Sequence, residues 1–219
     1  MLSNMRERTI TVRGTGNVSA KPDLIIMEMN IEVTERDYAA TLEGATGELD
    51  MLRAALASIG HDGKSLKTTS FNLQTKYESY KQKDGWKNRF TGYSCSHGLR
   101  LEFDLDMSTL GKTLGAIAEC EAGLQCNIKF SVKDLASVKE QLIESAVKNA
   151  TEKANCITQA AGVKLGAIQR MDYSWGELRL YSDTDMMVGE ASATKAMALE
   201  IEPDDIDASD NMTVVWAIE

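Results

Sequence analysis

The segment Thr9-Ile-Thr-Val-Arg-Gly-Thr-Gly-Asn-Val-Ser-Ala-Lys-Pro-Asp23 gives the strongest indication of the fold of this chain. It predicts a strand, a glycine turn at Gly14-Thr-Gly16 and a proline that leads into the next segment. Residues 24–33 then alternate apolar and polar side chains, as a half-buried strand does. We therefore predict that the two strands form the first hairpin of an α+β sheet.

A glycine pair after a strand also suggests a phosphate-binding loop, but the surrounding residues do not fit one. The pair lacks the Gly-Lys-Ser/Thr ending of such loops, and Ser19 stands where a dinucleotide fingerprint has its third glycine. The next segment is a strand, so no helix N-terminus is available to hold an anion. We predict a strand turn in which Asn17 and Ser19 bond to nearby backbone.

Apolar residues spaced three and four apart predict three helices, at residues 35–60, 106–118 and 134–161. Their apolar faces are, in order, Leu42, Ala45, Leu49, Leu52, Leu56 and Ile59; Leu110, Leu114, Ile117 and Ala118; and Val138, Leu142, Ala146, Ala150, Ala154, Ile157 and Ala161. The small side chains of the third face let that helix lie close to a sheet or to another helix.

Strands are also predicted at residues 67–80, 92–104, 128–132, 163–173, 195–201 and 212–218. Polar residues 81–89 resemble a hairpin tip with Asp84-Gly85 as its turn, and residues 174–193 show no period and are expected to form a long surface loop. The fold class is therefore α+β, mainly antiparallel sheet with long amphipathic helices packed on it. We expect one domain over residues 9–219, or two closely packed lobes, after a flexible N-terminus at residues 1–8.

Composition limits the possible functions. The chain has 219 residues, 24 Lys and Arg against 33 Asp and Glu, and a formal charge of −9, which argues against nucleic-acid binding. No run approaches the ~18 apolar residues of a membrane span, and residues 1–8 lack the apolar core of a signal peptide. The sequence as written predicts a cytoplasmic protein, or an exported cell-envelope protein if a leader has been removed.

The cysteines and histidines do not have the spacing of a zinc module, and we predict no metal and no cofactor. They are Cys95, Cys120, Cys126, Cys156, His61 and His97. Reduced thiols are expected, although Cys120 and Cys126 could close a small loop in an exported protein.

The pair closest to a catalytic arrangement is Cys95 and His97, which share one side of a strand. That side also carries Leu99, Leu101 and Phe103, and an apolar surrounding does not stabilise a thiolate. We therefore predict a partly buried structural pair and no catalytic residue.

Two further segments have alternative interpretations. The acidic cluster Glu200, Glu202, Asp204, Asp205, Asp207 and Asp210 offers oxygen ligands but misses the calcium-loop template, so a solvated loop and edge strand is expected. Met186-Met187 in the predicted loop is either a partner surface, an oxidation-sensitive spot or a segment folded back on its own domain.

Taken together, these segments resemble the SIMPL domain family, which includes bacterial periplasmic immunogenic proteins. The residues that carry the resemblance are Ile10-Thr-Val-Arg-Gly-Thr-Gly16 with Ala20-Lys-Pro-Asp23, Thr68-Thr-Ser-Phe-Asn-Leu73, Gly92-Tyr93, residues 148–162 with the exit Ala160-Ala-Gly-Val-Lys-Leu-Gly166, and Met212-Thr-Val-Val-Trp216.

The resemblance implies an α+β fold without known catalytic residues, and self-association of some members into ring- or channel-like assemblies. It also implies links of some members to oxidative-stress tolerance or host immune recognition. We expect a non-enzymatic self-assembling or binding module that forms a homo-oligomer. The alternatives are a small-molecule or metal-binding domain with a site in a sheet-helix cleft, and a signalling adaptor.

Overall fold

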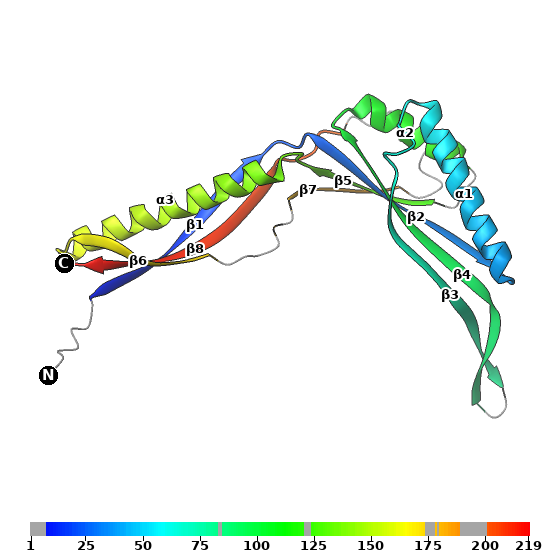
Figure 1. The fold of residues 1–219 in the computed structure, drawn as a ribbon, viewed down its shortest axis with the longest axis horizontal. Helices are drawn as coiled ribbons and strands as arrows, with labels where there is room; N and C mark the ends of the chain where they lie inside the picture. The colour runs from blue at the N-terminus through cyan, green and yellow to red at the C-terminus, as the bar shows by residue number, and fades with distance from the viewer. Residues whose placement is uncertain (1–7, 83–84, 121–123, 174–177, 179, 189–200) are drawn as a thin grey trace. The chain divides into compact units, whose positions relative to one another are not determined.

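A computed structural model describes residues 8–82, 85–120, 124–173, 178, 180–188 and 201–219, with the backbone alone for residues 185–188. In chain order the elements are β1 (Thr9–Ala20), β2 (Leu24–Glu35), α1 (Tyr38–Ser58), β3 (Lys67–Gln82), β4 (Gly85–Asp104), α2 (Met107–Glu119), β5 (Leu124–Ser131), α3 (Leu135–Ala161), β6 (Leu165–Tyr173), β7 (Tyr181–Val188) and β8 (Ile206–Ile218). Helices packed on antiparallel sheets confirm the predicted α+β class (Figure 1).

The chain forms two compact units. The first contains Met1–Pro22, Val132–Asp183 and Asp204–Glu219, and the second contains Asp23–Ser131 and Thr184–Pro203. Each unit has its own sheet, ordered β1-β8-β6 in the first and β3-β4-β2-β5-β7 in the second.

In the first unit, β1 pairs antiparallel with β8 from Thr9↔Ala217 to Ala20↔Ile206, and α3 packs on this pair. Asp134 caps α3 by accepting a hydrogen bond from the Ser137 amide at 2.9 Å. Gly162 ends the helix in the left-handed conformation with a φ of 70°, which glycine adopts without strain. The buried residues of the main cluster are Val12, Ala146, Ala150, Ala154, Met212, Val214 and Trp216.

The predicted glycine turn is wrong, because Gly14 and Gly16 lie inside β1. A Cβ atom added at Gly14 would overlap the carbonyl oxygen of Ala146, and one added at Gly16 would overlap that of Leu142. The glycines therefore allow the backbone of α3 to lie directly on β1. The predicted hairpin is also wrong, since β1 pairs with β8 while β2 pairs with β4 and β5.

Helix α3 also covers the open edge of β1. Asn149 Oδ1 accepts a hydrogen bond from the Thr15 amide at 3.0 Å, and Ser145 Oγ accepts one from the Asn17 amide at 3.2 Å. One turn further along the helix, Lys153 Nζ donates to the Arg13 carbonyl at 3.3 Å. Three side chains spaced four residues apart thus bond the outward backbone groups of an edge strand, which blocks its pairing with another chain.

The alanine face predicted for α3 is confirmed, except at its C-terminal end. There Thr158 is buried, whereas Ile157 is 49% exposed. The Thr158 hydroxyl donates to the Ala154 carbonyl at 2.9 Å, so its polar group is satisfied within the helix.

In the second unit, α1 and α2 contribute to one core with the five-stranded sheet. Asp37 and Asp106 cap the two helices by accepting hydrogen bonds from backbone amides of the first turn. The predicted face of α1 is largely confirmed. The core residues include Ile25, Met27, Met29, Ile31, Ala45, Leu49, Leu52, Leu56, Leu99, Leu101, Leu110, Leu114, Ile128 and Phe130.

The C-terminal third differs from its prediction. The long loop expected at residues 174–193 contains strand β7, and β8 begins at Ile206, earlier than expected. The predicted strand at 195–201 lies outside the described residues up to position 200, as do Glu200 and Asp84. The side chains of Met186-Met187 and the N-terminal residues 1–7 are also outside them. Among the described helices, none has both the length and the apolar character that a membrane span requires.

Candidate interaction surface

The β3-β4 hairpin extends beyond the rest of the sheet in the second unit. Pairing of β2 with β4 ends at Glu35↔Tyr93, whereas β3 and β4 remain paired to Gln82↔Gly85. We call the two-stranded part, residues 76–82 and 85–92, the arm; Figure 1 shows it continuing past the first turn of α1. Gly92 forms its base with a φ of 149°, and a Cβ atom there would overlap the Glu35 carbonyl oxygen.

One face of the arm carries a row of aromatic side chains in edge-to-face contact. Ring centroids are 5.5 Å apart for Tyr38 and Tyr93, 5.3 Å for Tyr93 and Phe90, and 5.8 Å for Phe90 and Tyr77. Trp86 pairs with Lys81 four register positions beyond the Tyr77↔Phe90 pair, so its ring lies on the same face, and the polar pair Ser79↔Asn88 stands between them. We call Tyr38, Tyr77, Trp86, Phe90 and Tyr93 the aromatic strip.

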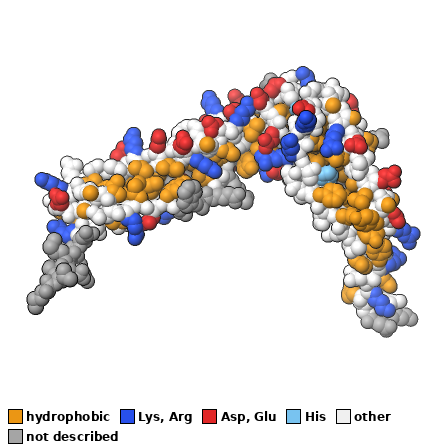
Figure 2. All heavy atoms as spheres, in the orientation of Figure 1, with side chains coloured by type: hydrophobic (Ala, Val, Ile, Leu, Met, Phe, Trp, Pro, Cys, Tyr) orange, Lys and Arg blue, Asp and Glu red, His pale blue; other side chains and the backbone are white. Residues whose placement is uncertain are grey.

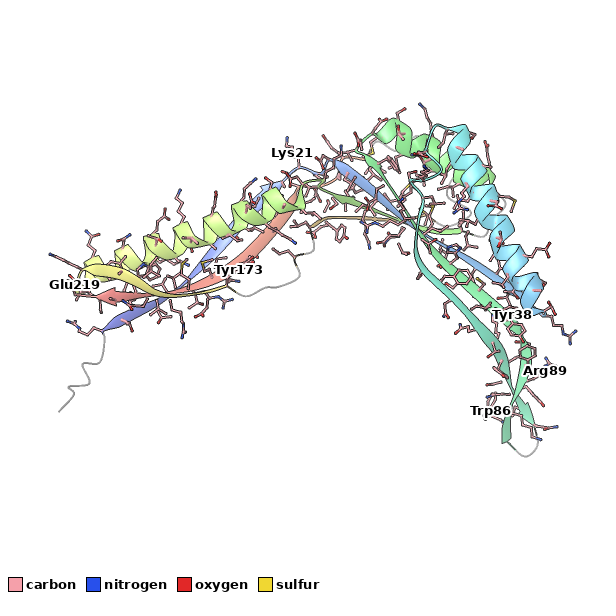
Figure 3. The ribbon with its side chains drawn as sticks, in the orientation of Figure 1. Lys21, Tyr38, Trp86, Arg89, Tyr173 and Glu219 are labelled. Atoms are coloured by element: carbon pink, nitrogen blue, oxygen red, sulfur yellow. The ribbon has the colours of Figure 1, made fainter. Side chains whose placement is uncertain are left out.

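The aromatic strip is largely open to solvent. Trp86 is 72% exposed, Tyr77 58%, Tyr38 51% and Phe90 44%. Helix α1 packs on β2 and β4, and among the described elements β3 has extensive contacts with β4 alone. Figure 2 shows hydrophobic side chains gathered along the arm, and Figure 3 shows Tyr38 near its base and Trp86 towards its tip. Exposed apolar side chains gathered on one face in this way mark interaction sites.

The arm is positively charged on a chain of formal charge −9. Its described charged residues are Lys76, Lys81, Lys87, Arg89 and Glu78. Glu78 forms an ion pair with Arg89 at 2.8 Å, and the Arg89 guanidinium lies 6.0 Å from the centroid of the Tyr80 ring. Three lysines of the arm therefore remain in excess over its carboxylates.

Cys95 and His97 lie where β4 crosses the core, and both are buried. His97 Nε2 bonds to Thr68 Oγ1 at 2.9 Å, and the Phe71 ring lies 5.2 Å from the imidazole. Burial raises the pKa of the Cys95 thiol. Burial, together with the charge of Arg53, lowers the pKa of His97. A protonated thiol beside an imidazole bound to threonine favours the structural interpretation of this pair.

The other candidate ligands are dispersed. Asp210 accepts a hydrogen bond from the Tyr173 hydroxyl at 2.6 Å, and Asp207 lies further along β8. Within the described ranges, no group of three His, Cys, Asp or Glu residues is placed to hold a metal ion. Cys126 is a free buried thiol, so the small loop through Cys120 is not closed by a disulfide. Burial raises the pKa of Cys126 to about 12.

The first unit contains an open pocket of about 470 Å³ where the ends of β1 and β8 pair. Its lining combines one carboxylate, three other polar side chains and two small apolar ones: Asp207, Asn17, Ser19, Ser209, Val18 and Ala208. No spacing rule for known sites singles these residues out in the sequence.

Sequence reasoning located the hairpin but missed the exposed aromatic strip. Tyr77 lies in the strand predicted at residues 67–80 and Trp86 in the polar tip predicted at 81–89, and neither prediction shows that their rings share an exposed face. The available signal was a tryptophan inside an otherwise polar segment.

Comparisons with known proteins find a matching sequence profile and several similar proteins. The sequence profile described as "SIMPL: Protein of unknown function (DUF541)" matches residues 10–216. A "26 kDa periplasmic immunogenic protein" of Brucella melitensis is 27% identical over 164 residues, and that of Brucella abortus is 26% identical. These alignments cover 73% of this chain and 64% of each relative, so the chain spans under two thirds of their length.

A third relative covers more of the chain. The "Uncharacterized protein YggE" of Edwardsiella ictaluri is 22% identical over 208 residues, which is 94% of this chain and 85% of the relative. The names of the two Brucella relatives contradict the cytoplasmic location predicted from residues 1–8, and they point to export instead.

Proposed function

The chain belongs to the SIMPL family, and on that premise we propose that it is a periplasmic, non-enzymatic module that self-assembles through its arm. The location is inferred from the printed names of two relatives. The self-assembly is inferred from one observation, the uncovered aromatic strip.

The composition of the aromatic strip supports a protein contact. Tryptophan, tyrosine and arginine dominate the binding energy of protein interfaces, and the arm carries all three. A two-stranded hairpin is marginally stable by itself, so a partner packed on the strip would stabilise the arm as well. A second copy of the chain is available as that partner wherever the protein is present.

A non-enzymatic role is supported by the state of the best catalytic candidate. The thiol of Cys95 is buried and its pKa is raised, which disfavours the nucleophilic thiolate. The imidazole of His97 bonds to Thr68.

Light scattering after size exclusion tests the proposal. We expect a mass well above the 24.0 kDa of one chain at micromolar concentration. Tyr77→Ser/Phe90→Ser should lower that mass, because it removes two rings at the middle of the strip. Ile168→Ser is the matched control, since Ile168 is also an exposed strand residue, at 51%, but lies in β6 of the first unit. A wild-type protein that stays monomeric, or an arm variant as large as wild type, would refute the proposal.

A further inference from the structure

The tip of the arm, residues 80–82 and 85–87, carries an aromatic ring and a lysine on each of its two faces. Trp86 and Lys81 are paired in the register and lie on one face, and the preceding pair, Tyr80 and Lys87, lies on the other. Trp86 is 72% exposed and Tyr80 40%, and both lysines are exposed. A protein partner packed on one face of a hairpin leaves the other face uncovered. A medium that surrounds the tip covers both faces.

The headgroup region of a lipid bilayer is a medium of this kind. Tryptophan and tyrosine are enriched there, because each combines an apolar ring with one polar N–H or O–H group. Lysine extends its methylene stem along apolar groups and keeps its ammonium among the headgroups. The tip presents these side chains together at the end of the hairpin, where Figure 3 shows Trp86.

The length of the tip matches the depth of the headgroup region. Each strand of the tip extends over about 7 Å, at about 3.3 Å per residue. Interfacial segments enter the boundary between headgroups and acyl chains by about 5–10 Å. Glu78, the one described carboxylate of the arm, lies further from the turn than the tip and is paired with Arg89 at 2.8 Å. The tip can therefore enter the headgroups while Glu78 stays outside.

The charge of the tip favours anionic lipids. Its described charged residues are two lysines, Lys81 and Lys87. The turn residues Lys83 and Asp84 carry one charge of each sign, so they leave this excess of cations unchanged. Each lysine near an anionic membrane surface adds to the attraction.

The length of the arm keeps this attraction from being cancelled by the rest of the chain. The formal charge of the whole chain is −9, which an anionic surface repels. Residues 76–82 extend about 20 Å at about 3.3 Å per residue. Charges are screened over about 8 Å at physiological salt, so a surface in contact with the tip interacts weakly with charges beyond the base of the arm.

We propose that the tip docks this protein on anionic lipid bilayers, with its two rings, Trp86 and Tyr80, in the headgroup region and its two lysines at lipid phosphates. The inference goes beyond the proposed function and does not depend on it. The rings in the middle of the aromatic strip, Tyr77 and Phe90, lie outside the tip and are left for contact between copies.

Flotation of the full chain with vesicles of phosphatidylglycerol and phosphatidylcholine in equal parts tests the inference. The wild type should float with these vesicles, float less at high salt, and stay in the bottom fraction with phosphatidylcholine alone. The ring variant is Trp86→Ser/Tyr80→Ser, and the lysine variant is Lys81→Glu/Lys87→Glu. Each should weaken binding at least about tenfold and keep the light-scattering mass of the wild type.

Two control variants make the same kinds of change outside the arm. Ile168→Ser/Met171→Ser removes two exposed apolar side chains of β6, and Lys139→Glu/Lys148→Glu reverses two exposed lysines of α3. Both should float as the wild type does. The lysine variant keeps both rings of the tip, so it tests the inference even if the serine substitutions unfold the arm. Glycerol phosphate at the same phosphate concentration should not compete, because it offers the rings no interface.

The outcomes separate this inference from the proposed function. A wild type that does not float with anionic vesicles, or floats equally with phosphatidylcholine, overturns the inference. Competition by glycerol phosphate, or equal weakening by a control variant, also overturns it, because a free anion or the overall composition then explains the binding. A fall in the light-scattering mass of either tip variant would assign the tip to contact between copies and overturn it as well. Flotation of a monomeric wild type retains the inference and refutes only the proposed function.

Discussion

Gly14 of β1 faces Ala150 of α3 so closely that a Cβ atom added to the glycine would lie 2.7 Å from the alanine Cβ atom. Real Cβ atoms do not approach to that distance, so at this point the helix and the strand are in contact through backbone and methyl groups. The pairing of smallest residues on both elements sets how near α3 lies to the sheet of the first unit.

Gly14→Ala should therefore destabilise the protein by about 1–3 kcal/mol, because the added methyl group forces α3 away from β1. Gly47→Ala is the matched control: Gly47 lies inside α1 with no atom within 4 Å of an added Cβ. Alanine there should stabilise the helix by about 0.5–1 kcal/mol. Urea unfolding measures both, and equal effects of the two substitutions would contradict this account.

Asn149→Ala should cost about 1 kcal/mol, because it leaves the Thr15 amide at the edge of β1 without its acceptor. Asn149→Asp keeps an oxygen in the same position and should cost less. Urea unfolding gives the free energies, and hydrogen exchange of the Thr15 amide should accelerate in the alanine variant. An unchanged exchange rate would show that the side chain does not cover this edge.

These two contacts explain why the glycine turn predicted from the sequence is wrong at β1. Apolar residues spaced three and four apart predict a helix from a short stretch of sequence, and this spacing correctly predicted α1, α2 and α3. The reason for Gly14 lies in Ala146 and Ala150, more than a hundred residues away, and no local pattern contains it. A turn is the commonest use of a glycine pair, and here the long-range contact overrides that preference.

The thiol of Cys126 should make stability depend on pH in the alkaline range. Its pKa is about 12 in the folded protein and about 8.5 in an unfolded chain. Above pH 8.5 the unfolded state binds fewer protons than the folded state, so the free energy of unfolding falls as pH rises. The contribution is complete below pH 8.5 and decreases by about 1.4 kcal/mol per pH unit above it.

The comparison of wild type with Cys126→Ala isolates this contribution. The alanine variant loses packing at every pH, but its deficit relative to wild type should shrink by about 2 kcal/mol between pH 8 and pH 10. Ile128→Val, which also removes buried packing but no titrating group, should differ from wild type by a constant amount. Urea unfolding across the pH range measures both, and a constant deficit for Cys126→Ala would exclude the raised pKa.

The candidate surface was less predictable than the fold for a related reason. Alternation along β3 and β4 assigns side chains to faces, and it correctly placed Cys95 and His97 in the buried row. It does not say where the neighbouring elements stop. Tyr77 and Phe90 continue the apolar row beyond the last residue of β2 that pairs with β4, so their exposure follows from the lengths of other elements.

The rate of amide hydrogen exchange should depend on protein concentration more strongly in the arm than in the rest of the chain. It has one pair of strands and no described layer on its aromatic face, so its amides should exchange faster than those of residues 94–103 in the same strand β4. Raising the concentration until the light-scattering mass increases should slow exchange in residues 76–82 and 85–92. Residues 94–103 are the internal control and should not change, because β2 flanks all of them and β3 flanks residues 94–100 within one copy. Exchange in the arm that is slow at every concentration, or that does not respond when the mass rises, would show that the aromatic strip is not where the copies meet.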